Sequence, residues 1–300
     1  MKPGLDFHAK LRLRKHVLLR SLAGVFFLSV ALAAQEQGPI APPPEHTTVH
    51  RVDTHAPPPE APPDLPVDQI IQRFSQKELE FAQAHRKYGF TKSLRLTEYG
   101  LDGKPSGEFG MSTQSVVASD GWVSQRVVDK PTSTLHYMDP EPPDMDFISK
   151  LPFYPLVPSE IPKYNIKYLG REKVDEIDCY IFEAKPKMVD RAHPYFQGIV
   201  WVDTKYIEIV KTYGTFVTDL GSLHSQNLPF SNFETYRENV EGKYWFPDYS
   251  RSDEEVHIKD HQVPVRLVIK WSDFKPLAVP SSTATSPSSS QTPPDKSAQP

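Results

Sequence analysis

The stretch from residue 168 to residue 214 constrains the fold of this chain most strongly. β-Branched and aromatic residues alternate or cluster within it at 177–184, 198–202 and 207–214, and turn residues separate these runs. Apolar residues at every second position are typical of β-strands with one buried face. We therefore expect successive antiparallel strands joined by short turns, and these apolar positions carry no catalytic group.

The same pattern continues on both sides of this stretch. The ranges expected to form strands are 92–99, 108–119, 121–128, 133–138, 164–171, 177–185, 197–203, 206–217, 232–240, 243–251 and 265–274. Helices are expected at 66–74, 76–88 and 144–151, since Ser75 and Glu78 have the spacing of a capping box between the first two. The predicted fold class is mainly β with a few helices (α+β).

The N-terminal end has a different character. Residues 1–20 hold six basic side chains and one acidic one, and an apolar run of thirteen residues follows at 22–34. Because that run is too short to span a bilayer comfortably, we interpret 1–33 as a cleaved secretory signal peptide. An uncleaved N-terminal anchor is the alternative. The signal predicts a periplasmic protein without a stable membrane span after cleavage, and no cysteine follows the run to carry a lipid.

Composition divides the remaining chain into three parts. Residues 34–63 are proline-rich and are expected to form a disordered linker, while 279–300 are rich in serine, threonine and proline and are expected to form a disordered tail. Residues 64–278 are long enough for one β-rich domain.

Charge and cysteine content narrow the classes of partner. Removing the leader changes the formal net charge from −4 to −9, because it takes away six basic residues and one acidic residue. An acidic protein is a poor default partner for nucleic acid or anionic membranes. Cys179 is the only cysteine, so it cannot form an intramolecular disulfide, and we expect a quiet thiol in a strand.

The strand-rich stretch also has a recognisable residue pattern. It reads Y-L-G-R-E-x-V-D-x-I-D-x-Y-x-F over 168–182, then G-x-x-W-V-D over 198–203 and I-x-I-V-K-T over 207–212. This resembles the bacterial outer-membrane lipoprotein-sorting proteins, the LolA/LolB-like superfamily, over residues 67–275. The resemblance implies a curved antiparallel sheet that forms an incomplete (half) barrel, capped by helices, whose concave face receives acyl chains.

Alternation along the expected strands selects the side chains of one face. In the last strand, for example, Leu267, Ile269 and Trp271 point one way, and Arg266 and Lys270 point the other. The predicted ligand-binding residues are Leu94, Leu96, Tyr180, Phe182, Ile199, Trp201, Leu267, Ile269 and Trp271. The alternative is that this face is a core packed solidly beneath the helices.

The sequence contains none of four common motifs for catalysis or phosphate binding. The sequence has no G-x-S-x-G, G-x-x-x-x-G-K-[ST], H-E-x-x-H or G-x-G-x-x-G motif. His257 and His261 lie in the densest titratable cluster, SDEEVHIKDHQ, for which we expect a solvated turn, with a zinc or enzyme site as a minor alternative. We therefore expect no catalytic residue, no metal and no cofactor.

Together these features predict a non-enzymatic periplasmic carrier or binding protein. Its expected partners are lipid or lipoprotein acyl chains, with an envelope protein as donor or acceptor in outer-membrane biogenesis. The alternative is an envelope sensor or scaffold that uses the same fold to bind a protein partner.

Overall fold

The structure of the chain is a computed structural model that describes residues 41–42, 62–118, 122–150, 152–189, 195–217, 230 and 232–277. The predicted signal peptide, most of the proline-rich linker and the C-terminal tail lie outside the described residues. Within the described residues, no helix is both long and apolar enough to cross a membrane.

The described residues form two α-helices, one 3₁₀ turn and eleven strands. The helices are α1 (Val67–His85) and α2 (Pro142–Ile148), and the 3₁₀ turn is Ile161–Lys163. The strands are β1 (Tyr88–Tyr99), β2 (Pro105–Val117), β3 (Val123–Val127), β4 (Thr132–Ser133), β5 (Tyr164–Val174), β6 (Ile177–Pro186), β7 (Tyr195–Asp203), β8 (Ile209–Val217), β9 (Asn232–Val240), β10 (Tyr244–Ile258) and β11 (His261–Pro276).

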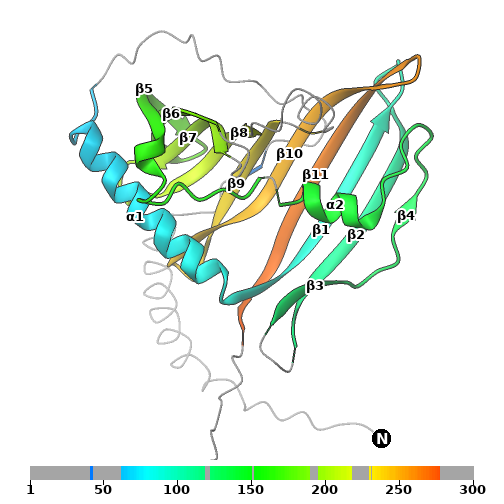
Figure 1. Ribbon diagram of the computed structural model, residues 1–300, viewed down its shortest axis with the longest axis horizontal. Helices are drawn as coiled ribbons and strands as arrows, with labels where there is room; N and C mark the ends of the chain where they lie inside the picture. The colour runs from blue at the N-terminus through cyan, green and yellow to red at the C-terminus, as the bar shows by residue number, and fades with distance from the viewer. Residues whose placement is uncertain are drawn as a thin grey trace, which may run out of the picture.

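All eleven strands belong to one antiparallel sheet. Its order is β3-β2-β1-β11-β10-β9-β8-β7-β6-β5, and β4 pairs with β2 beside β3. The sheet ends at β3 and β5 without closing into a barrel. It curves, and α1 and α2 lie across its concave side (Figure 1). The predicted fold class, an open curved sheet capped by helices, is confirmed.

One row of paired residues shows how the concave face is composed. Cross-strand partners share a face, so pairing traces this row from β2 to β5. The row consists of Met111, Leu94, Ile269, Ser250, Thr235, Thr212, Val200, Phe182 and Tyr168. Its two ends are apolar and its middle carries hydroxyl groups, with Thr235 Oγ1 and Ser250 Oγ 2.9 Å apart. The concave face is therefore two apolar regions separated by a polar stripe, and not one continuous apolar wall.

Each apolar region is covered by one helix. Ile70 and Phe74 of α1 pack over Phe182 and its neighbours on β6 and β7, and we call this group the α1 cluster. Met145 and Ile148 of α2 pack over side chains of β1, β2 and β11, and we call this group the α2 cluster.

The expected break between two N-terminal helices is wrong. α1 is continuous from Val67 to His85, and Ser75 lies inside it with its hydroxyl donating to the Gln72 carbonyl oxygen. Glu78 does not serve a capping box because its carboxylate faces the sheet and binds Arg237.

Other boundaries also differ from the expectation. β10 continues to Ile258 and β11 begins at His261, so the presumed long solvated turn is only Lys259 and Asp260. Lys259 has a φ of 54°, as tight hairpin turns require. The expected strand 133–138 is reduced to β4, and α2 begins two residues earlier than expected, at Pro142.

Candidate functional site

An apolar pocket lies where α2 and the segment before it meet the outer end of β10. Its volume is about 390 Å³, within the range of about 300–1,000 Å³ that is usual for small-molecule sites. Eight of its ten lining side chains are apolar: Met138, Pro140, Met145, Phe147, Ile148, Phe230, Val256 and Ile258. The other two are Asp139 and Asp144 at the rim. We call this hollow the α2 pocket.

Two local sequence patterns position the walls of the α2 pocket. In α2, Met145 and Ile148 are one turn apart and face the sheet, while Phe147 remains largely exposed. In β10, Val256 and Ile258 alternate with polar residues, so both side chains point to the same side. The pocket therefore combines a helix face with the extension of a strand hairpin.

Helix α2 is tied to the sheet by a buried lysine. The Lys92 side chain is only 4% exposed, and its Nζ lies 3.1 Å from Asp146 Oδ1 and 2.6 Å from Ser149 Oγ. Burial lowers the pKa of Lys92, against the opposing effect of the Asp146 carboxylate. Although burial opposes ionisation of Asp146, the ammonium groups of Lys150 and Lys92 hold its pKa below the ordinary value.

A set of hydrogen bonds to Glu98 holds the segment that leads into α2. Glu98 of β1 is 0% exposed, and its carboxylate accepts hydrogen bonds from the backbone N–H groups of His136, Tyr137 and Met138 at 2.8, 3.0 and 2.8 Å. Since Met138 lines the α2 pocket, this carboxylate fixes one of its walls.

Helix α1 is tied to the sheet by an ion pair. Glu78 and Arg237 of β9 have side chains 2% and 6% exposed, and they make hydrogen bonds of 2.6 and 3.1 Å. Glu78 also accepts the N–H of Leu156 at 3.3 Å, and the guanidinium lies 4.5 Å from the centre of the Phe81 ring. Each covering helix is thus connected to the sheet by one buried, charged contact.

The nine residues predicted from the sequence occupy three different places. Leu94, Leu96, Leu267, Ile269 and Trp271 belong to the α2 cluster, beneath the helix that borders the α2 pocket. Tyr180 and Phe182 belong to the α1 cluster.

The expectation that all nine share one face is wrong for Ile199 and Trp201. Trp201 pairs with Ile181, whereas Phe182 pairs with Val200, so Ile199 and Trp201 point to the opposite face. On β7 both alternating sets are apolar, because each face of this strand is buried. Alternation could not say which set faces the helices.

Sequence reasoning missed the side chains that line the α2 pocket. Its walls come from α2, from the segment before it and from the part of β10 that was expected to be a turn. The alternation of Val256 and Ile258 with charged residues was a signal for a longer strand, but the density of titratable side chains around it favoured a loop.

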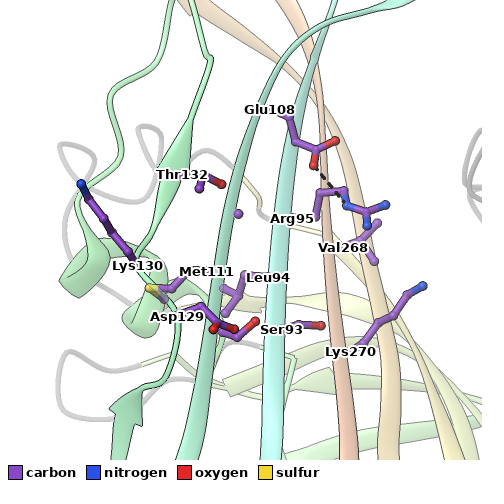
Figure 2. A pocket seen from close by; sticks show the side chains of 12 residues that line it. Ser93, Leu94, Arg95, Glu108, Met111, Asp129, Lys130, Thr132, Val268 and Lys270 are labelled. Carbon is purple, nitrogen blue, oxygen red and sulfur yellow. Dashed lines mark ion pairs between the residues drawn. The ribbon is translucent and has the colours of Figure 1, made fainter.

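A second pocket, of about 290 Å³, lies on the face of β1, β2 and β11 away from α2 (Figure 2). Its charged side chains have both signs, with Arg95 Nε 3.4 Å from Glu108 Oε1 and with Lys130, Lys270 and Asp129 nearby. A third hollow of about 450 Å³, between α1 and residues 158–166, mixes apolar side chains with Asp68 and Lys187. Neither has the apolar lining that an acyl chain requires.

His85, near the end of α1, lies inside a group of aromatic rings. The rings within 6 Å of it belong to Phe81, Phe90, Phe153 and Phe246. Its Nε2 is buried and has no hydrogen-bond partner among the described residues. Burial, and secondarily the Arg237 charge, lowers the pKa of His85 to about 4.

We expect acidification to destabilise the fold through His85. Because its folded pKa lies below the ordinary value, its contribution to stability is complete above about pH 6.5 and is lost as the pH falls toward 4. The loss should be on the order of 2 kcal/mol between pH 7 and pH 4.5.

Urea unfolding at several pH values should show a smaller acid sensitivity for His85→Phe than for the unsubstituted protein. Asp248, whose pKa burial raises to about 7, acts in the opposite direction and cancels in this comparison. Equal acid sensitivity of the two proteins would contradict the prediction.

The other reactive side chains singled out in the sequence are Cys179 and the histidines of the β10–β11 hairpin, and their surroundings are those of ordinary strand residues. Cys179 is buried, and burial raises the pKa of its thiol to about 12. His257 Nε2 lies 3.0 Å from Gln262 Nε2 across the β10–β11 pair. Among the described residues, no group of three or more histidine, cysteine or acidic side chains could hold a metal ion.

Comparison with known proteins gives structural neighbours only. No family model and no curated protein matches the chain. A DUF1329 family protein from Desulfovibrio piger is 14% identical, with 70% of this chain and 93% of that chain covered and a TM-score of 0.31. A LolA superfamily protein from Nitrosomonas europaea is 14% identical, with coverages of 72% and 96% and a TM-score of 0.30. A putative outer membrane lipoprotein-sorting protein domain from Vibrio parahaemolyticus is 14% identical, with coverages of 68% and 94% and a TM-score of 0.29. The resemblance expected from the sequence is therefore also found among solved structures.

Proposed function

We propose that this protein is a non-enzymatic binding protein that takes up an acyl chain of a lipid or lipoprotein in the α2 pocket. The observation that carries the proposal is a pocket of about 390 Å³ with eight apolar lining side chains. Burying an acyl chain contributes about 0.8 kcal/mol per methylene, so roughly ten inserted methylenes supply the about 8 kcal/mol of a micromolar complex. With the predicted leader at 1–33, the place of action is the periplasm.

The α2 pocket can be extended only if α2 moves. This helix has seven residues, and only Met145 and Ile148 of it are buried. Directly beneath it lie Leu94, Ile269 and the rest of the α2 cluster. In our proposal, displacement of α2 exposes these residues to the ligand, and the five predicted residues of this cluster become part of the binding surface. The affinity then depends on the cost of breaking the Lys92 tie.

The direct test is native mass spectrometry of protein purified from the periplasm of cells that make it. A bound lipid or acylated peptide supports the proposal. Folded protein that is consistently empty, and that also fails to bind a fluorescent fatty acid added afterwards, would overturn it.

Filling the α2 pocket should weaken binding without unfolding the protein. Val256→Trp adds a large ring to the wall formed by β10, and we expect the affinity for a fluorescent fatty acid to fall about tenfold or more, because at least about two methylenes lose their place. The matched control is Leu101→Trp, which adds the same ring at a fully exposed turn. Fluorescence titration of both variants is the measurement, and equal affinities would place the ligand elsewhere.

A further inference from the structure

The edge strand β3 is unusually apolar for an exposed sheet edge. β3 forms a hairpin with β2, and the exposed large apolar side chains of this hairpin are Val117, Trp122, Val123, Val127 and Val128, with Trp122 74% exposed. Edge strands are normally protected against pairing by charges and irregularities. β5, at the other edge, has this protection, because it carries Lys167, Glu172 and Lys173 and its register shifts before Gly170.

The backbone of β3 presents hydrogen-bonding groups to the open edge. The Ala118 N–H donates to the Trp122 carbonyl at 2.8 Å, and the Val128 N–H donates to the Ser112 carbonyl at 3.0 Å. Trp122 and Val128 therefore direct backbone groups toward β2. Backbone direction alternates along an antiparallel strand. The residues whose N–H and C=O groups point away from β2 are Val123, Gln125 and Val127.

The sequence of this edge has the same polarity pattern in both directions. Residues 122–128 read WVSQRVV, which is two apolar, three polar and two apolar residues, centred on Gln125. An interface between two identical copies related by a two-fold axis must be self-complementary. Two antiparallel copies of this segment, centred on Gln125, satisfy that requirement. The resulting opposite pairs are Trp122 with Val128, Val123 with Val127, Ser124 with Arg126, and Gln125 with Gln125.

We propose that β3 pairs with β3 of a second copy of this chain, so that the two sheets continue into one another across a two-fold axis at Gln125. The charges agree with this register, because Arg126, the only charged residue of the segment, faces Ser124 and not a second arginine. The outward backbone groups agree as well, since Val123, Gln125 and Val127 are the positions that exchange hydrogen bonds in this register. The interface lies at the sheet edge, away from the α2 pocket.

The first test is disulfide cross-linking of purified Gln125→Cys. At the two-fold axis the two Cα atoms of residue 125 lie about 5.5 Å apart, within the range of about 4.4–6.8 Å that a disulfide spans. The matched control is Ser124→Cys on the same strand, whose copies lie about 7–8 Å apart on the diagonal and are poorly placed to bond. We expect a covalent dimer of Gln125→Cys under mild oxidation and little of one for the control. Similar yields for both variants, or no dimer for either, would overturn the proposal.

The second test measures association without a cross-link. Gln125→Pro removes an outward N–H in both copies, and proline is tolerated at an edge strand where that group makes no bond within the sheet. Sedimentation should show dimers of the unsubstituted protein that dissociate on dilution, with affinity roughly thirty-fold lower for Gln125→Pro. Circular dichroism of the variant should show the same β-sheet signal as the unsubstituted protein, as a control for folding. A monomer at all concentrations would refute self-pairing. A blue shift of the tryptophan fluorescence on lipid vesicles, without any dimer and lost in Trp122→Phe, would also refute it and assign the edge to a lipid surface.

Discussion

Replacing Arg237 with methionine should lower the free energy of unfolding by roughly 3–5 kcal/mol, because it leaves a buried carboxylate without its partner. Glu78 is 2% exposed and receives two hydrogen bonds from the guanidinium, at 2.6 and 3.1 Å. Methionine preserves most of the side-chain length but supplies neither charge nor donor. Urea unfolding followed by circular dichroism measures the loss.

The double variant separates the ion pair from simple packing. Glu78→Met combined with Arg237→Met removes both charges together, so no unpaired charge remains, and we expect it to be more stable than either single variant. The residual loss comes from two backbone groups that lose a partner: the Leu156 N–H, which donates to Glu78 at 3.3 Å, and the Ile209 carbonyl, which accepts from Arg237 at 3.4 Å. Additive losses in the double variant, or single losses below about 1 kcal/mol, would show that the pair does not hold α1.

The pair also illustrates what the sequence could not predict. Ser75 and Glu78 have the spacing of a capping box, so local reasoning ended one helix and began another between them. The structure instead uses Glu78 to meet Arg237, which is 159 residues away along the chain. A contact of that separation overrides local capping preference, and no pattern within α1 indicates it.

Strand alternation predicted the fold better than it predicted the site. Period-two patterns identified the antiparallel sheet, because each strand needs its own buried face. They failed where both faces are buried, as for Trp201 and Phe182, which lie on opposite sides of the sheet. They also could not reveal the polar stripe through Ser250, since small hydroxyl residues inside strands look like ordinary solvent-facing positions. The α2 pocket depends on how the seven-residue helix α2 packs against the end of β10. This packing is a tertiary contact, which the local sequence pattern does not determine.

Replacing Glu98 with alanine should cost roughly 3 kcal/mol of unfolding free energy and weaken fatty-acid binding, since three backbone donors lose a charged acceptor. The three N–H groups belong to His136, Tyr137 and Met138, which precede α2. Met138 forms part of the α2 pocket, so release of this segment disturbs the wall as well as the fold. Unfolding by urea and fluorescence titration on the same preparation measure the two effects.

Two further variants show whether the loss of stability in Glu98→Ala comes from the lost charge, from the changed shape, or from the removal of any acidic side chain. Glu98→Gln keeps the shape and one acceptor oxygen, but its amide NH2 group, a donor, then faces a backbone N–H, which is also a donor. Its loss of stability should therefore be smaller than that of Glu98→Ala but greater than zero. Glu108→Ala removes an exposed carboxylate, paired with Arg95, from the neighbouring strand β2, and should cost less than about 1 kcal/mol. If Glu98→Ala lowered the free energy of unfolding and the fatty-acid affinity no more than Glu108→Ala, the three hydrogen bonds to Glu98 would not be what positions α2 and the pocket wall.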